Sequence, residues 1–211
     1  MGLMKLLMRD PLAFALVALP LLFSVILHEV AHGWVAYRMG DSTAKYSGRL
    51  SLNPLKHLDP IGTLMLFLAG FGWAKPVPVN FNNLSDRRKG LIFVSSAGIL
   101  TNILLAFFAL VFIRLFSASS SGMALILVYK VCTYVAYINI TLAALNLIPI
   151  PPLDGSKILM GISWEKTPHF IFRLEPYGFF IIIGLLYLGL LDPLIGFFRW
   201  MIMAAIGILL H

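Results

Sequence analysis

The residues best suited to chemistry lie in one short stretch, His28-Glu29-Val30-Ala31-His32. His28 and His32 are four positions apart, so on a helix their imidazoles project from one face, about one turn apart. At this spacing two imidazole nitrogens can share a tetrahedral zinc ion. Glu29 stands beside the first histidine, where its carboxylate can take a proton as water attacks a carbonyl and then pass it to the leaving amine. The stretch therefore predicts two zinc ligands and a general base within one helical turn.

A catalytic zinc usually has three protein ligands and leaves its fourth position for water, so a third ligand is expected elsewhere. Asp154 is the best candidate, because it follows a proline-rich run, 149–152, that prevents ordinary helix and holds the chain extended. Gly155 would let the backbone approach closely behind the carboxylate. As an alternative, Asp154 and Gly155 form only a turn. His57 is a rival ligand or a partner of a ligand. The remaining carboxylates considered lie in segments that look solvated: Glu165, Glu175, Asp59 and Asp192.

Composition indicates an integral membrane protein. The chain of 211 residues is 60% hydrophobic and 12% charged, with a mean hydropathy of +0.92. The short histidine motif also occurs by chance on surface helices of soluble proteins. Here, however, it follows the apolar run 12–27, and charged side chains inside a membrane cost about 2.5 to 3.5 kcal/mol each on insertion scales. Membrane context therefore favours a functional role for the motif.

Charge and cysteine content exclude two other classes of protein. The net charge of +7 comes from basic residues in blocks between apolar segments, which is typical of topology signals, so no nucleic-acid partner is expected. Cys132 is the only cysteine, so neither a disulfide framework nor a thiolate zinc site can form within the chain. A metal site must use histidine and carboxylate.

The apolar segments predict an all-α polytopic membrane protein with about five transmembrane helices. Ile61 to Trp73 is too short to cross and contains glycines, so we expect a re-entrant or interfacial element there. Lys130 either snorkels to the nearer surface or marks a later start of its helix. A tight connection is expected at 117–122. The predicted spans are Pro11–Tyr37, Gly90–Phe116, a third ending near Leu147, Tyr177–Leu191 and Leu194–Leu210. We expect a single membrane-embedded domain, 1–211, with a catalytic core at about 11–160 and closing helices at about 177–210.

Two polar segments suggest short β-strands near the active site. Gly48 to Leu52 alternates like a strand, and the run from Lys75 to Asn80 is expected to be extended because it contains two prolines. Either could offer backbone edges to an unwound substrate segment by strand addition.

Positive charge predicts the orientation of the chain in the membrane. The segment 38–89 holds eight of the 16 Lys and Arg residues, so it should face the cytoplasm. Lys157, Lys166 and Arg173 fall on the same side in a five-span arrangement, which places the N-terminus outside. Lys5 and Arg9 oppose this orientation.

Two distant motifs resemble the paired signatures of the site-2 protease family. One is His28 to His32, and the other is Asn146 to Gly155 at the end of a later span. The likeness covers roughly residues 20 to 160 and includes the stretches Gly72 to Asn80 and Ser96 to Asn102. It implies a three-helix catalytic core. This chain is expected to depart from larger relatives of the family in having no PDZ-like or nucleotide-sensing appendage.

The resemblance implies a role for each matching residue. It places one Zn²⁺ ion on His28, His32 and Asp154, and uses Glu29 as the base. It also gives Asn146 a place near the substrate carbonyl or oxyanion, where an amide can donate a hydrogen bond. The alternative role of Asn146 is to cap its own helix. Asn102 lies in an apolar span, where an amide is expected to hydrogen-bond to a neighbouring helix.

These observations predict an intramembrane zinc metalloendopeptidase that cleaves a peptide bond in or next to a transmembrane segment. Its expected partners are a transmembrane protein or peptide substrate, the lipid bilayer and a possible regulatory membrane protein. Its expected location is the plasma membrane of a prokaryote, with the active site open to the cytoplasm. Two alternatives stay open: a metal transporter, in which Glu29 would have no role as a base, and an inactive homologue that only binds membrane segments. The sequence carries no signal for the oligomeric state.

Overall fold

Four long apolar helices dominate the computed structural model, which describes residues 3–69, 72–116, 122–164 and 174–210. Each is long and apolar enough to cross a membrane. Within the described residues the fold is all-α, as predicted, and the chain is an integral membrane protein. The four candidate spans are α2 (Pro11–Arg38), α5 (Arg87–Phe116), α6 (Met123–Asn146) and α10 (Asp192–Leu210).

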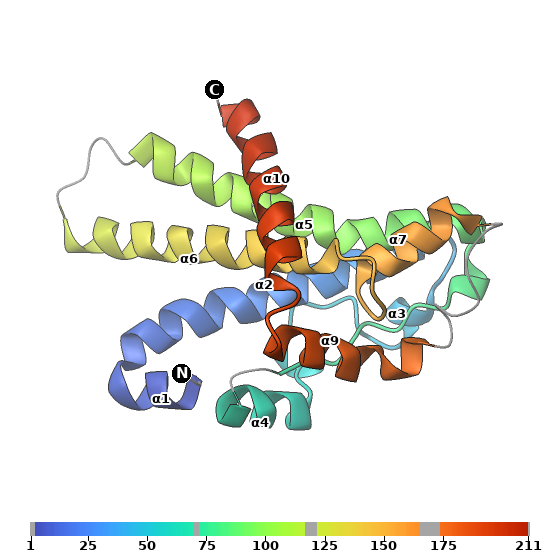
Figure 1. The fold of residues 1–211 in the computed structure, drawn as a ribbon, viewed down its shortest axis with the longest axis horizontal. Helices are drawn as coiled ribbons and strands as arrows, with labels where there is room; N and C mark the ends of the chain where they lie inside the picture. The colour runs from blue at the N-terminus through green and yellow to red at the C-terminus, as the bar shows by residue number, and fades with distance from the viewer. Residues whose placement is uncertain (1–2, 70–71, 117–121, 165–173, 211) are drawn as a thin grey trace.

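Helices α2, α5 and α6 pack together as the three-helix unit that holds the site, and Figure 1 shows them running alongside one another. Their contact surfaces are rich in small buried side chains, including Ala106 and Ala109 of α5 and Ala143 and Ala144 of α6. Small residues let helix backbones approach closely, which favours packing in lipid, where the hydrophobic effect gives little help. Asp10 begins α2, because its carboxylate accepts a hydrogen bond from the Ala13 N–H at 2.9 Å.

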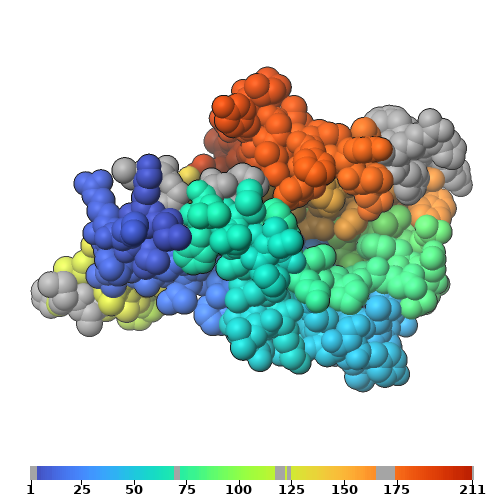
Figure 2. Space-filling model, turned by 90° about the horizontal axis from the view of Figure 1, so that it is seen from below, coloured from blue at the N-terminus to red at the C-terminus, as the bar shows by residue number. Residues whose placement is uncertain are grey.

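Shorter elements surround this unit. In Figure 2 the face seen from below carries α1 in blue, α4 in teal and α9 in orange. The helix α10 crosses the bundle and ends away from it (Figure 1). The short helices are α1 (Leu3–Arg9), α3 (Thr43–Tyr46), α4 (Pro60–Ala69), α7 (Asp154–Ile162) and α9 (Gly178–Tyr187). The 3₁₀ turns are Pro54–Lys56, Phe81–Asn83 and Glu175–Tyr177.

About five spans were predicted, and the described residues contain four candidate spans. The expected span Tyr177–Leu191 contains only the ten-residue helix α9, which at ~1.5 Å per residue covers about half of a hydrocarbon core. The helix ends before Gly189, whose φ of +68° turns the chain toward α10. The last span begins at Asp192, where Leu194 was expected. Hydropathy alone does not reveal this turn.

The predicted β-strands are also wrong. Across the described ranges the structure has no strand, only an isolated bridge between Leu58 and Ala74. Gly48 adopts a φ of +63° in a turn, which interrupts the expected strand at its first residue. The 75–80 run is non-helical, as expected, but Pro76 and Pro78 carry no N–H with which to pair in a sheet.

Three further expectations have different outcomes. In the described part of the segment 61–73 the helix is α4, whose ten residues are too few to cross a membrane, while its re-entrant placement stays a prediction. Lys130 lies inside α6 with an exposed side chain, so this helix does not begin after it. The connection expected at 117–122 lies outside the described residues, apart from Gly122.

Candidate metal centre

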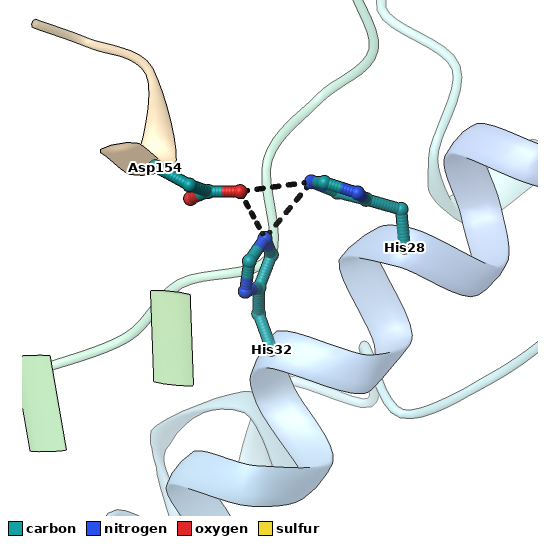
Figure 3. Close-up of side chains that lie close together, drawn as sticks. All are labelled: His28, His32 and Asp154. Carbon is teal, nitrogen blue, oxygen red and sulfur yellow. Dashed lines mark hydrogen bonds and ion pairs between the residues drawn. The ribbon is translucent and has the colours of Figure 1, made fainter. Parts of the chain in front are cut away.

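The helix α2 carries His28 and His32 one turn apart, and both side chains are buried. Their Nε2 atoms lie 3.0 Å from each other, so both rings present the same nitrogen to one point (Figure 3). The spacing of four residues places them there, because a helix brings side chains at i and i+4 onto one face.

Asp154 reaches this point from the start of α7. Its Oδ2 lies 3.2 Å from Nε2 of His28 and 3.1 Å from Nε2 of His32 (Figure 3). The chain turns sharply behind it: a Cβ added to Gly155 would lie 2.4 Å from the backbone oxygen of Leu147. The expected close approach at Gly155 is therefore confirmed. Asp154 does not form a mere turn, since it opens a helix and points into the bundle.

The other imidazole nitrogens fix the orientation of both rings. Nδ1 of His32 donates to the backbone oxygen of Val94 at 2.6 Å, and Nδ1 of His28 lies 3.3 Å from Oδ1 of Asn102. A ring that donates through Nδ1 keeps a lone pair on Nε2. Hydrogen bonds to the second nitrogen are typical of metal-bound histidines. As expected, Asn102 bonds to a neighbouring helix, and its partner is a member of this cluster.

Three electron-pair donors thus face one another with separations of 3.0 to 3.2 Å. Oδ2 of Asp154 is buried and has no hydrogen-bond donor. Tetrahedral zinc at its usual bond lengths separates its ligand atoms by about 3.3 Å. His28, His32 and Asp154 therefore fit a zinc ion. Within the described residues they form the group of three histidine or carboxylate side chains that lie close enough together to hold a metal.

Glu29 lies next to this cluster but points toward another segment. Its Oε2 accepts a hydrogen bond from the Val77 N–H at 2.8 Å. Val77 belongs to the extended stretch that follows α4. This contact fixes the orientation of the Glu29 carboxylate, which is not one of the three facing groups.

Most of the chain, including this cluster, matches a known family. A family model for peptidase family M50 matches residues 16–187. The chain belongs to peptidase family M50. It is therefore a zinc metalloprotease of the site-2 protease type, as its motifs indicated.

Proteins named as zinc metalloproteases resemble this chain over most of its length. It is 39% identical to "Putative zinc metalloprotease YwhC" of Bacillus subtilis over 170 residues, which covers 78% of this chain and 77% of the relative. It is 32% identical to "Putative zinc metalloprotease Rip2" of Mycobacterium tuberculosis strain H37Rv, covering 90% of this chain and 73% of the relative. A match to "Zinc metalloprotease MJ0392" of Methanocaldococcus jannaschii, at 24% identity, covers 75% of this chain and 38% of that protein. No matching solved structure was found.

Gly98 of α5 is a site residue that sequence reasoning missed. A Cβ added there would lie 2.5 Å from Cε1 of His28 and 2.5 Å from Nε2 of His32. Only a residue without a side chain lets α5 lie this close to both rings. A glycine inside an apolar helix costs about 1 kcal/mol relative to alanine, and that cost is the signal that could have identified it.

We expect Gly98→Ala to lower zinc affinity about 10- to 100-fold, the range found when groups around metal ligands are disturbed. The added methyl group must displace one or both imidazoles. Zinc affinity would be measured by competition with a chromophoric chelator. The matched control is Gly196→Ala in α10, where an added Cβ meets nothing within 4 Å. Equal zinc affinity in the two variants would contradict the tight packing of α5 on the site.

Asn146 and His57 make local contacts. The Asn146 side-chain amide donates to the Leu142 backbone oxygen at 3.0 Å, within its own helix, so its role near a substrate carbonyl stays a prediction. Nε2 of His57 lies 2.7 Å from the backbone oxygen of Ser51, and His57 is not part of the three-residue cluster. Among the other carboxylates, Asp59 accepts from the Gly62 N–H at 2.7 Å, while Glu165 lies outside the described residues.

Proposed function

We propose that the chain is an intramembrane zinc metalloendopeptidase that hydrolyses a peptide bond in or next to a transmembrane segment. The observation that carries this proposal is the buried meeting of Asp154 with His28 and His32, which lie on a helix able to span the membrane, with Glu29 next to His28 in the sequence. Ionisable groups inside a membrane bundle are costly and usually functional. Membership of family M50 supports peptide hydrolysis as the chemistry.

The chain's own residues have distinct parts in this reaction. Zinc held by His28, His32 and Asp154 would supply a Lewis acid that polarises the substrate carbonyl and acidifies a water molecule. Glu29 takes the proton from the attacking water and returns it to the leaving amine. The N–H of Val77 holds the Glu29 carboxylate in one orientation during these transfers. Asn146 is our candidate donor to the oxyanion, provided that its amide leaves the Leu142 oxygen when substrate binds.

An apolar cavity beside α2 supports binding of a membrane segment. It has a volume of about 200 Å³ and lies between α2, α4 and α6. Val25, one turn before Glu29, lines it together with Leu66 and Trp73. We propose that it accepts an apolar substrate side chain. A substrate helix must become extended first, because its peptide bonds are otherwise held in helical hydrogen bonds.

Water is proposed to enter from the cytoplasm of a prokaryotic cell. His32 precedes the end of α2 at Arg38 by six residues, or ~9 Å along the helix. The positively charged segment 38–89 follows this end, which favours its placement on the cytoplasmic side. A protein-lined cleft of this depth is short enough to be hydrated.

Reconstitution in liposomes tests the proposed function against metal transport. The purified chain would be incubated with zinc and a synthetic transmembrane peptide, and the products identified by mass spectrometry. We expect cleavage within or beside the apolar segment, and we expect a chelator to stop it. In parallel, an entrapped zinc-sensitive dye would report metal flux. Zinc flux without cleavage would favour a transporter, while zinc binding with neither flux nor cleavage would favour an inactive homologue.

A further inference from the structure

The contact that orients Glu29 depends on an unusual stretch of backbone, the 75–80 run. The Val77 N–H, which donates to Glu29, lies near its middle. Pro76 and Pro78 flank Val77 and have no N–H groups to donate. The run is not part of a sheet, and its first residue is anchored by one backbone hydrogen bond, from the Lys75 N–H to the His57 oxygen at 2.8 Å. Side chains from elsewhere supply further contacts.

Two buried charged side chains hydrogen-bond to the backbone at the two ends of the run. Nη2 of Arg49 donates to the backbone oxygen of Lys75 at 2.6 Å. At the other end, Oδ2 of Asp41 accepts from the Asn80 N–H at 2.7 Å. Asp41 is 0% exposed and Arg49 is 8% exposed. Charged groups are seldom buried so deeply unless they are paired or hydrogen-bonded.

Asp41 is itself held by a set of donors. Its Oδ1 accepts from the backbone N–H and the hydroxyl of Thr43 and from the side-chain amide of Asn83. Burial raises the pKa of Asp41, but these donors outweigh it and lower the pKa below the ordinary value. Asp41 is therefore a fixed anion at neutral pH.

The run also packs closely against α2. A Cβ added to Gly33 would lie 2.7 Å from Cγ1 of Val77 and 2.7 Å from Cδ2 of Leu50. The run therefore lies directly against the helical turn that follows Glu29. A shift of the run along or away from α2 would carry the Val77 N–H away from the carboxylate.

We propose that Asp41 and Arg49 are positioning residues that hold the 75–80 run so that the Val77 N–H fixes the carboxylate of Glu29. This inference rests on the proposed function, because it assigns the orientation of the general base. Neither residue belongs to the metal cluster, and neither forms one of these hydrogen bonds with His28, His32 or Asp154. Their effect is therefore on the rate of proton transfer and not on metal binding.

Asp41→Asn and Arg49→Gln test the proposal. An asparagine has one oxygen where Asp41 uses two, so at least one donor is left facing an amide N–H. A misplacement of about 1 Å at a catalytic group can cost 10²-fold, so we expect kcat to fall about 10- to 100-fold. We expect KM to change less than threefold, as estimated for loss of a contact that acts mainly in the transition state. Bound zinc should stay at the wild-type level, and Arg49→Lys, which keeps a cationic donor, should regain part of kcat.

Asp86→Asn and Arg87→Gln serve as matched controls, because they make the same chemical changes at the start of α5, where Asp86 is partly exposed and Arg87 is exposed. Asparagine keeps an oxygen that can accept from the Lys89 N–H, as Asp86 does at 2.9 Å. We expect wild-type kcat from both. Wild-type kcat in Asp41→Asn and Arg49→Gln would overturn the proposal. Loss of zinc in step with kcat would also overturn it, because it would show a general disturbance of the site. A wild-type chain that cleaves nothing would instead refute the proposed function.

Amide hydrogen exchange provides a readout that needs neither metal nor turnover. In the metal-free protein, the Val77 amide should be protected from exchange in the wild type. The protection should fall at least about tenfold in Asp41→Asn, Arg49→Gln and Glu29→Ala, since each removes a part of the same hydrogen-bonded arrangement. Unchanged protection of Val77 in the first two variants would show that they do not hold the run.

Discussion

Replacement of Glu29 by glutamine is expected to reduce the rate of peptide cleavage by about 10² to 10⁴, the usual contribution of a general base. Glutamine has nearly the same shape and can still accept a hydrogen bond from the Val77 N–H through its amide oxygen. It cannot take a proton from water. The rate would be measured from cleavage of a transmembrane peptide in liposomes, and bound zinc by elemental analysis of the same protein.

The matched control is Glu175→Gln, which makes the same change at an exposed position in the 3₁₀ turn before α9. We expect it to cleave like the wild type. Zinc content should be equal in all three proteins, because Glu29 is not one of the three facing groups. Cleavage by Glu29→Gln at the wild-type rate would show that the base lies elsewhere.

Replacement of Asp154 by alanine is expected to abolish both zinc binding and cleavage under conditions in which the wild type is saturated. The change removes one of three donors and leaves the two imidazoles with no anionic partner. Disturbing a group outside the ligand set costs about 10- to 100-fold in metal affinity, so loss of a ligand should cost at least about 100-fold.

Zinc affinity would be compared with that of Asp192→Ala, which removes an exposed carboxylate at the start of α10. We expect this control to keep its zinc and its activity. Retention of tight zinc binding by Asp154→Ala would refute the assignment of the third ligand. The third ligand would then have to be a residue that the structure places away from the cluster.

The sequence revealed those parts of the site that depend on local spacing. Two histidines four residues apart must share a helix face, and the proline-rich turn before Asp154 needs a definite path. The structure brings His28, His32 and Asp154 together, as the predicted zinc site requires. Contacts between helices that are distant in the sequence were harder to predict. Val94 and Asn102 support the histidines across 62 and 74 positions, and no pattern within α2 identifies them.

The errors in the predicted fold have the same origin. Hydropathy correctly identified segments that prefer lipid, but it treated 177–191 as one span because it does not register the turn at Gly189. Alternation in 48–52 suggested a strand, although the side chain of Arg49 is committed to the Lys75 carbonyl. In both cases backbone conformation and long-range hydrogen bonds override a local pattern.

X-ray absorption spectroscopy at the zinc edge of the purified chain tests the central claim most directly. We predict one zinc ion per chain with two imidazole nitrogens and one carboxylate oxygen at about 2.0 to 2.2 Å, and with water in the fourth position. The spectrum of Asp154→Ala should lose the carboxylate contribution together with most of the metal. A chain without zinc, or a zinc spectrum that is identical in the wild type and in Asp154→Ala, would contradict the account.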